Sequence, residues 1–409
     1  MRQTPESRVP GKKPSNRGAP ENARVTETMR RILMLSYEFP PLGGGIGISC
    51  QNLLRELASD TSISVDLITS GAGEGLEVQD LDERIRVFKL PVGKRNLHFW
   101  TASEIARWTW GASRLSRKLS SQQDYDLSHC WGGWPSGLLG YRLRHEIPYI
   151  IGLRGSDVPG YNVRLRHLDT LVFERLSRLV WGQAREVLAN SENLKALARR
   201  TSVDIPIRVI RNGVDCEMFT PGSSVEPFTF LYVGRLIERK GLLYLLEAFD
   251  ALSKTMPDLH LTLAGDGPDR GRLEEYCNHH ELGSKVKLTG RLTREQLLPL
   301  YQSASVFVMP SLEESLPNAV LEAMASGLPI VTTPTGAREL LDSNGLVVES
   351  ADCEALRQAL ERYLQEPELL LAHGRSSREL AESMTWGAMA RAYRETFETV
   401  LAPKPTSQS

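Results

Sequence analysis

Short apolar runs alternate with helix-length stretches along this 409-residue chain, and the alternation starts twice. The first series begins with residues 31–36 and the second with residues 228–233, both of them runs suited to a buried parallel strand. Strands that alternate with helices predict a parallel sheet with helices on both faces, and the chain is too long for one ordinary core. We therefore expect an α/β protein made of two Rossmann-like, doubly wound domains that face each other across a cleft. Ligands of such sheets bind beyond the carboxyl ends of the strands.

Composition and turn signals set the expected boundaries. Residues 1–28 and 402–409 are rich in Pro, Ser and other polar residues and predict disordered tails. Asn212-Gly213 and Pro221-Gly222 are turn signals between the two series. The sequence thus predicts a first domain at 29–207, a second domain at 208–385, and a last helix at 386–401 that packs back on the first domain.

The charge is unevenly spread around a net value of −1. Lys and Arg outnumber Asp and Glu in residues 1–205, and the reverse holds in the remainder. Either these charges lie on solvated faces, or the basic half meets an anionic partner such as a membrane surface or a phosphorylated acceptor. One helical segment mixes aromatic and cationic residues as interfacial helices do: Trp100, Arg107, Trp108, Trp110, Arg114, Arg117 and Lys118.

The five cysteines are scattered, form no C-x-x-C pair, and indicate reduced thiols. No apolar stretch has the length of a membrane span, and the first residues do not resemble a secretory signal. We expect a cytoplasmic protein, peripheral on the inner face of the membrane if the basic half binds lipid. No Asp-x-Asp follows a predicted strand and no cluster has metal-ligand spacing, so we expect no metal and no cofactor. No nucleic-acid partner is expected.

A glycine cluster, Gly43, Gly44 and Gly45, stands between the first predicted strand and the first predicted helix. Glycines let backbone N–H groups approach an anion closely, and the helix that follows adds a positive dipole end. The spacing matches neither a P-loop nor G-x-G-x-x-G. An anion-binding loop and a plain strand-to-helix turn both fit this pattern.

The loop after the first strand of the second series carries Arg235 and Lys240. A planar guanidinium and a compact ammonium both suit the oxygens of a diphosphate. A charged loop that merely keeps this edge soluble fits equally well.

A short helix is predicted at about 317–326, with start signals at Ser315 and Pro317 and a stop signal at Gly327. The free N–H groups at the helix start would face the cleft and bind an anion. This start is the segment Leu316, Pro317, Asn318 and Ala319, in which only Pro317 lacks an N–H group. Glu314 lies in the loop before this helix, and Glu322 lies within the helix. Carboxylates accept paired hydrogen bonds from neighbouring sugar hydroxyls. The alternative is that Glu314 pairs with the helix dipole and that Glu322 is a solvated surface acid.

These motifs together resemble the retaining glycosyltransferases of family 4, also called group 1. The resemblance runs from about residue 30 to residue 400 and is most specific in the second half. The matching segments are Arg211-Asn212-Gly213-Val214-Asp215, Gly234-Arg235-Leu236 with Lys240-Gly241, Ala264-Gly265-Asp266-Gly267-Pro268, and Glu314-x7-Glu322 with its surroundings.

The resemblance implies a role for each candidate residue. Residues 29–207 would form the acceptor side, and 208–385 would bind the nucleotide sugar. Arg235 and Lys240 would hold the donor diphosphate together with the amides that begin the short helix. Glu314 would contact the hydroxyls of the donor sugar and Glu322 the ribose. Arg291 would lie near the base, and the loop Gly43–Gly45 would close over the donor.

One position departs from the family pattern. Many members carry a His in a His-Gly-x-Asp turn near the reacting carbon, and Arg154 stands there in Arg154-Gly155-Ser156-Asp157. Arg cannot act as a base, but it can stabilise a leaving diphosphate or bind an anionic acceptor. The alternative is a structural pairing of Arg154 with Asp157. His129, Trp131 and Asp157 are further candidates for the acceptor side, and a structural role for the lone His fits equally well.

The function implied is retaining, metal-independent transfer of a hexosyl group from a nucleotide-diphosphate sugar to a glycan or lipid-linked acceptor. The resemblance suggests cell-surface polysaccharide or glycolipid biosynthesis. Two alternatives stay open: a nucleotide-sugar epimerase or hydrolase on the same fold, and a non-catalytic subunit that binds sugar nucleotides. The sequence does not identify the nucleotide, the sugar, the acceptor, the linkage or the oligomeric state.

Overall fold

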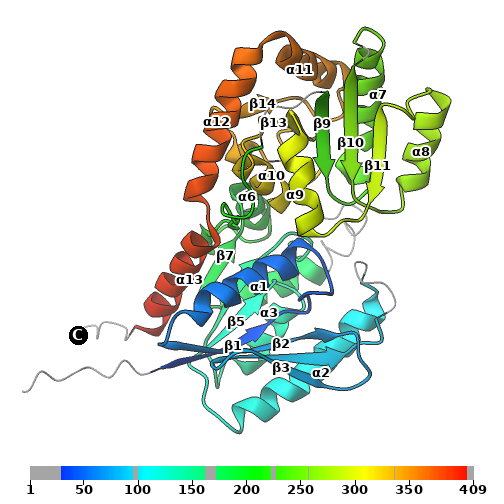
Figure 1. Cartoon of the computed structure of the whole chain (residues 1–409). Coiled ribbons are helices and arrows are strands. Elements are labelled where there is room, and N and C mark those ends of the chain that lie inside the picture. Colours follow the sequence, from blue (N-terminus) through cyan, green and yellow to red (C-terminus); the bar gives the residue numbers. More distant parts are fainter. Residues whose placement is uncertain are drawn as a thin grey trace, which may run out of the picture.

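Two α/β units make up the computed structural model, which describes residues 29–94, 100–161, 172–222, 227–256, 258–335 and 337–402 (Figure 1). The expected tails at 1–28 and, apart from residue 402, at 402–409 lie outside the described residues. Each unit has one sheet whose faces are covered by helices. The first sheet is parallel except at one edge, and the second sheet is parallel throughout its described pairings. The predicted α/β class with two doubly wound, Rossmann-like units is confirmed.

The first sheet has eight strands in the order β3-β4-β2-β1-β5-β6-β7-β8. Its strands are β1 (Arg30–Leu35), β2 (Ile63–Gly71), β3 (Glu77–Asp82), β4 (Ile85–Pro91), β5 (Leu127–Trp131), β6 (Tyr149–Leu153), β7 (Glu186–Ala189) and β8 (Ile207–Val209). Only the β3–β4 pair of this sheet is antiparallel among its described pairings. The strand order reverses direction at β1, so the loop after β1 opens at the switch point where such sheets bind ligands.

Helices cover both faces of the first sheet. One face carries α2 (Ala102–Ser120), α3 (Ser136–Leu143), α5 (Glu174–Gly182) and α6 (Glu192–Thr201), whose apolar residues share one buried cluster. The other face carries α1 (Gly45–Ala58) and the last helix of the chain, α13 (Trp386–Leu401). Met389, Tyr393 and Phe397 of α13 are buried at i, i+4 and i+8, as one face of a helix requires.

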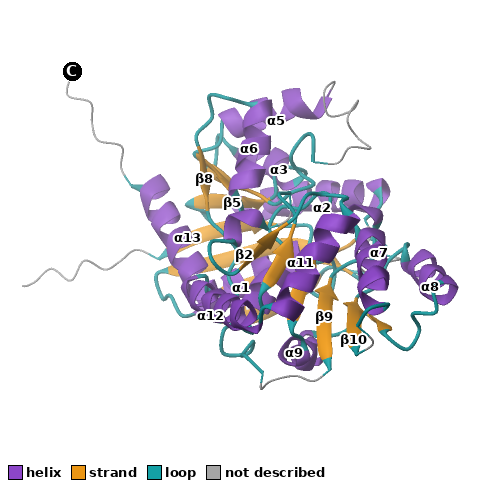
Figure 2. Ribbon diagram, turned by 90° about the horizontal axis from the view of Figure 1, so that it is seen from above, coloured by secondary structure: helices purple, strands orange, loops and turns teal. Residues whose placement is uncertain are grey.

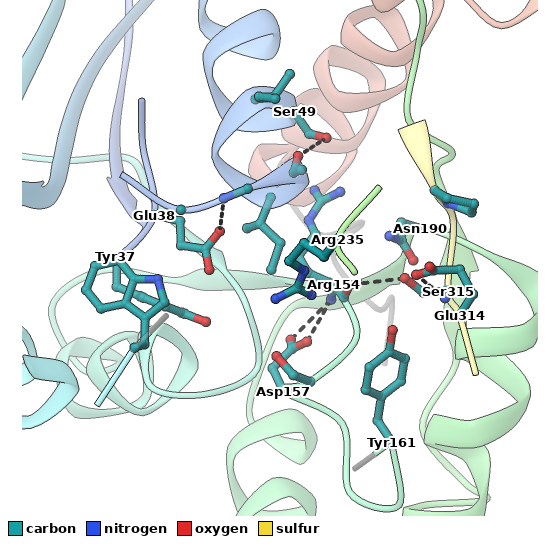
Figure 3. A pocket seen from close by; sticks show the side chains of 18 of the residues that line it. Tyr37, Glu38, Ser49, Arg154, Asp157, Tyr161, Asn190, Arg235, Glu314 and Ser315 are labelled. Atoms are coloured by element: carbon teal, nitrogen blue, oxygen red, sulfur yellow. Dashed lines mark hydrogen bonds between the residues drawn. The ribbon is translucent and has the colours of Figure 1, made fainter. Parts of the chain in front are cut away.

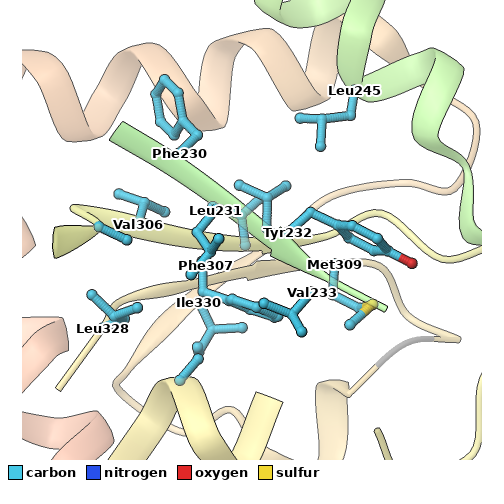
Figure 4. Packing of buried hydrophobic residues seen from close by; sticks show 14 of the residues in the cluster. Phe230, Leu231, Tyr232, Val233, Leu245, Val306, Phe307, Met309, Leu328 and Ile330 are labelled. Carbon is cyan, nitrogen blue, oxygen red and sulfur yellow. The ribbon is translucent and has the colours of Figure 1, made fainter. Parts of the chain in front are cut away.

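The second sheet has six strands in the order β11-β10-β9-β12-β13-β14, all of them paired in parallel. They are β9 (Phe228–Val233), β10 (Leu259–Ala264), β11 (Val286–Gly290), β12 (Val306–Met309), β13 (Ile330–Thr332) and β14 (Gly345–Val347). The helices are α7 (Leu242–Ser253), α8 (Arg270–His279), α9 (Arg294–Ser303), α10 (Asn318–Ala325), α11 (Cys353–Gln365) and α12 (Pro367–Ser383). Apolar side chains of β9, β12 and β13 interleave at the centre of this core (Figure 4).

The chain passes between the two units at two places that lie side by side. After β8 the main-chain N–H of Val214 donates to the carbonyl of Met384 at 2.8 Å, and Val214 forms a β-bridge with Thr385. A Cβ at Gly213 would lie 2.3 Å from the amide nitrogen of Trp386. Glycine is therefore required at position 213, since a side chain there would push the two crossings apart.

The aromatic and cationic segment forms α2, but its tryptophans do not share a face. Trp108 is fully buried in the core, whereas Trp110 is 65% exposed. Trp100 lies against Tyr37 and under the Lys94 ammonium, 3.6 Å from the ring centroid. Trp110 is thus the exposed tryptophan of this segment, while Trp108 belongs to the core.

Candidate active site

A cavity of about 2650 Å³ opens between the two sheets, at the carboxyl ends of β1, β6, β9 and β12 (Figure 3). Residues from both units line it. Every donor-side residue expected from the sequence lies on its wall: Gly43, Gly44, Gly45, Arg235, Lys240, Arg291, Glu314, Ser315, Leu316, Pro317, Asn318, Ala319 and Glu322. Arg154 and Asp157 line it from the opposite unit.

Helix α10 begins at this cavity and is eight residues long. Pro317 is its N-cap, without a side-chain cap, so the first N–H groups of the helix are not closed off by a capping side chain. The helix stops where expected, because Gly327 adopts a φ of 73°, in the left-handed region that glycine tolerates. The start of α10 therefore presents amides and a positive dipole end to the cavity.

Lys240 and Glu314 form an ion pair near the N-terminus of this helix, and both side chains are less than a tenth exposed. Gly241 after Lys240 has a φ of 65°, and a Cβ there would lie 2.2 Å from the carbonyl oxygen of Pro310. This tight turn fixes the Lys240 side chain against the loop that carries Glu314. Burial, followed by the nearby Arg239 and Arg235, lowers the pKa of Lys240 to about 7, while the ion pair with Glu314 acts in the opposite direction.

Glu322 is buried rather than solvated, which excludes the surface-acid alternative. Its carboxylate accepts a hydrogen bond from the Tyr301 hydroxyl at 3.0 Å and lies 3.5 Å from the Nε of Arg294. Burial raises the pKa of Glu322, and Arg294 and Tyr301 oppose that rise. Two side chains of α9 thus hold this carboxylate at the cavity wall.

Arg154 does not pair with Asp157 through its side chain. Asp157 accepts from three main-chain N–H groups, those of Gly133 at 2.6 Å, Gly155 at 2.7 Å and Arg154 at 2.9 Å. The Arg154 guanidinium points elsewhere and donates to the Tyr393 hydroxyl at 2.5 Å and to Asn212 at 3.3 Å. The Asp157 carboxylate therefore shapes the turn, and Arg154 faces both α13 and the crossing between the units.

His129 and Trp131 do not lie on the acceptor side of the cavity, and this expectation is corrected. Both are fully buried, and neither is among the described residues that line the cavity. The His129 ring lies among Trp131, Tyr393 and Phe397, and burial, with a smaller effect of Arg154, lowers its pKa well below the usual value. His129 is thus a neutral core residue, because β5 directs it toward α13.

Glu38 is a site residue that the sequence patterns missed. Its carboxylate accepts from the N–H of Gly44 at 3.1 Å, and a Cβ on Gly43, whose φ is 90°, would lie 2.5 Å from Glu38 Oε2. Burial raises the pKa of Glu38, while this N–H and the Arg235 charge oppose the rise. A single Glu before a Pro-Pro turn has no periodicity, so only its position beside the glycine amides identifies it.

The glycine loop lies against the start of α10. A Cβ on Gly45 would be 3.6 Å from Nδ2 of Asn318, and Asn318 also accepts from Asn212 at 2.8 Å. The two units therefore meet at the cavity through the glycine loop, the crossing and α10.

No group of three or more His, Cys, Asp or Glu residues that could hold a metal occurs within the described residues. None of the helices described is long and apolar enough to cross a membrane.

Two family models match the chain. "Glycosyltransferase Family 4" matches residues 43–218, and "Glycosyl transferases group 1" matches residues 227–366. The chain is 26% identical to the D-inositol 3-phosphate glycosyltransferase of Corynebacterium aurimucosum, over 88% of this chain and 94% of that protein. It is also 26% identical to the glycogen synthase of Mycobacterium tuberculosis, over 90% and 94%.

Solved structures share the arrangement of both units. Sucrose-phosphate synthase from Thermosynechococcus elongatus matches with a TM-score of 0.76 at 24% identity, over 90% of this chain and all of that one. HepE from Anabaena, solved in complex with UDP, matches with a TM-score of 0.70 at 15% identity, over 91% of this chain and all of that one. The fold is therefore the GT-B fold of these enzymes, and the chain belongs to the family 4, or group 1, glycosyltransferases.

Proposed function

We propose that this glycosyltransferase moves a hexosyl group from a nucleotide-diphosphate sugar to an acceptor hydroxyl, with retention at the anomeric carbon and without a metal. One observation carries the proposal. Arg235, Lys240 and the amide end of α10 all line the same cavity, so three independent sources of positive potential converge where a diphosphate would bind.

The donor would lie along the second unit. Glu322, held by Tyr301 and Arg294, would accept hydrogen bonds from the two ribose hydroxyls, and Arg291 would lie near the base. Glu314 would contact the sugar hydroxyls. HepE, a structural neighbour, was solved with UDP and with UDP-glucose, which supports a uridine nucleotide as the first donor to test.

The chemistry would rest on stabilising the leaving group. As the bond from the sugar to the diphosphate breaks, negative charge grows on the phosphate oxygens, and fixed cations and amides stabilise that charge more than the ground state. The acceptor hydroxyl would attack from the same face and pass its proton to the departing diphosphate. Glu314 is not proposed as a nucleophile, because it is paired with Lys240 and glycosidase chemistry needs two carboxylates that flank the bond.

We propose a glycan or lipid-linked acceptor, in cell-surface polysaccharide or glycolipid synthesis, and peripheral contact with an anionic membrane. The exposed Trp110 and the exposed Arg107, Arg114 and Lys118 of α2 support the membrane contact. Flotation with anionic liposomes tests it. Binding that does not depend on the anionic lipid would exclude the contact.

The experiment that tests the activity starts with a thermal-shift screen of UDP-, GDP- and ADP-sugars. The stabilising donor is then incubated with an acceptor panel, and NMR of the product reports the anomeric configuration. Arg235→Ala should lose transfer, whereas Arg272→Ala, at an exposed position of α8, should keep it. If Arg235→Ala keeps full activity, the donor site is placed wrongly.

Two alternatives give different results in the same experiment. A nucleotide-sugar hydrolase or epimerase would form product from the donor alone, with no acceptor present. A non-catalytic subunit would bind the donor in calorimetry and turn over with no member of the panel. Transfer that requires an acceptor excludes both.

A further inference from the structure

Asn212 makes two side-chain hydrogen bonds, one to each unit, although the proposed function assigns it no role. Its Oδ1 accepts from the Arg154 guanidinium of the first unit at 3.3 Å, and its Nδ2 donates to Oδ1 of Asn318 in the second unit at 2.8 Å. Asn212 is 5% exposed and lies on the crossing that follows β8. One buried amide therefore joins the loop after β6 to the start of α10.

The Arg154 side chain that faces Asn212 is held in place from two other sides. The Tyr393 hydroxyl accepts from its Nη2, and its guanidinium lies over the Trp131 ring. Tyr393 belongs to α13, which packs on the first unit beside α1 (Figure 2). A guanidinium has donors only and cannot accept a hydrogen bond. The atom of residue 212 that faces it must therefore be an acceptor.

The donors of Arg154 thus fix the orientation of two amides in succession. Because Oδ1 of Asn212 is turned to Arg154, its Nδ2 is the end left for Asn318. An amide nitrogen only donates, so Asn318 must offer its Oδ1, and its own Nδ2 is the end that does not face Asn212. A side chain with two nearly equivalent ends is in this way given one orientation.

Nδ2 of Asn318 is a buried donor with no hydrogen-bond partner among the described residues. A Cβ on Gly45 would lie 3.6 Å from it, so it stands between the glycine loop and the first residue of α10. Gly45, Asn318 and Lys240 all line the cavity. Buried donors are nearly always paired in folded proteins, and one that is left over marks a place that a ligand or a water can complete. The cation and the helix amides beside it favour an anion there.

We propose that the side-chain amide of Asn318 donates to the diphosphate of the donor, and that Asn212 is the positioning residue that keeps this amide turned toward it. Arg154 then acts on the diphosphate through two amides. As the bond from the sugar to the diphosphate breaks, the N–H group of Asn318 stabilises the growing negative charge more than the ground state, so its effect falls on kcat. The role in catalysis rests on the proposed function, whereas the contact with a diphosphate can be tested without it.

The first experiment observes the Asn318 amide directly, by heteronuclear NMR of the full chain labelled at asparagine. The side-chain signal of Asn318 is the one missing from Asn318→Ala. Inorganic pyrophosphate and UDP supply a diphosphate, and uridine lacks it. The Asn318 signal should move with a diphosphate and stay in place with uridine. The matched control is the signal of Asn278, an exposed residue of α8 outside the cavity lining, which should move with none of the three.

The same measurement on Asn212→Asp tests the orientation. Aspartate keeps the shape of asparagine and still accepts from Arg154, but it presents an oxygen to Asn318 and cannot donate. The Asn318 amide should therefore turn its Nδ2 toward residue 212, and its signal should no longer respond to a saturating diphosphate. A signal that responds as in wild type would overturn the positioning role of Asn212.

The second experiment is a double-mutant cycle on kcat, with the donor that the thermal-shift screen identifies. Asn318→Ala should lower kcat about tenfold or more and Asn212→Ala about fivefold, with the donor KM within about threefold in both. A residue that acts only through another has no effect once the other is gone. Asn212→Ala should therefore change kcat less than about twofold in the Asn318→Ala background. Additive losses would overturn the positioning role, and Asn278→Ala should keep full kcat.

Failure of the proposed function looks different. In that case wild type transfers no sugar from any donor, and the NMR experiments alone decide whether Asn318 contacts a diphosphate and whether Asn212 orients it. If the proposed function holds and this proposal fails, wild type turns over, but neither diphosphate moves the Asn318 signal or uridine moves it as far as UDP does.

Discussion

The guanidinium carbon of Arg154 lies 3.4 Å from the centroid of the Trp131 ring. This cation–π contact and the hydrogen bond to Tyr393 orient a charged side chain that is 5% exposed and still lines the cavity. The aromatic residues of β5 and α13 therefore hold the Arg154 side chain in its orientation. In this way Trp131 affects the site without contacting the cavity.

If Arg154 stabilises the leaving diphosphate, replacing it with Ala should lower kcat for transfer by about 100-fold, because one fixed positive charge is lost. The donor Kd should change less than threefold. Arg154→Lys keeps the positive charge but loses the planar guanidinium that stacks on Trp131, so it should recover only part of kcat. Steady-state kinetics with the identified donor, together with the midpoint of thermal unfolding, check this. A variant with full kcat and a lowered midpoint would show that Arg154 is structural.

Glu314→Ala and Lys240→Ala should each reduce transfer by about 10²–10³-fold. Each also leaves a buried charge without its partner, so the single variants should unfold more readily than Glu314→Gln/Lys240→Met. Activity assays and chemical denaturation separate the two effects. Arg272→Ala is again the control, and unchanged turnover in both single variants would contradict the assignment.

The donor affinity should fall as the pH rises above about 7 toward 10.5. A lysine with a lowered pKa loses its ammonium charge at a lower pH than usual, and the neutral amine binds the diphosphate more weakly. The diphosphate diester of the donor has no proton to lose in this range. Calorimetry from pH 6.5 to 9.5 should show about a tenfold loss for wild type. Lys240→Arg, which stays charged, should show a flat profile; equal slopes for the two proteins would exclude Lys240 as the cause.

Glu322→Gln should raise the Kd of the nucleotide by about 10-fold or more, since a charged hydrogen bond to the ribose is weakened. The sharper readout compares UDP with its 2′,3′-dideoxy analogue. Wild type should prefer UDP, and the variant should discriminate much less. A variant that keeps the full preference would show that Glu322 does not contact the ribose.

Phe397→Ala should lower the free energy of unfolding by about 3–5 kcal/mol, because it leaves a cavity in the core that joins α13 to the first sheet. Urea denaturation measures this. Glu398→Ala, at the next and exposed position, should change stability by less than about 0.5 kcal/mol. Equal stability of the two variants would mean that α13 contributes little to the first unit.

Parts of the fold were readable because burial leaves a local pattern. Buried strands such as β1 and β9 are continuous apolar runs, and the caps of α10 follow from Pro317 and Gly327. β3 (Glu77–Asp82) gave no such pattern, because nearly all of its side chains are exposed at the sheet edge. β8 and β14 are three residues each, too short for a period to show.

The site residues also divide into those that a local motif predicts and those that depend on contacts between distant parts of the chain. The expected donor residues come from contiguous motifs, and the structure brings them to one cavity. The partners of Arg154 could not be foreseen, because Asn212 and Tyr393 are 58 and 239 residues away in the chain. His129 was misplaced for the same reason: no local feature shows that α13 returns to cover β5.

The two crossings of the chain touch at Val214 and Met384, with Gly213 fitted against Trp386. The two units are also in contact at the glycine loop and at the start of α10, so the crossings are one of several places that fix how the units lie against each other. A side chain at position 213 would push the crossings apart and should therefore disturb the donor site from a distance, although no atom of Gly213 lines the cavity.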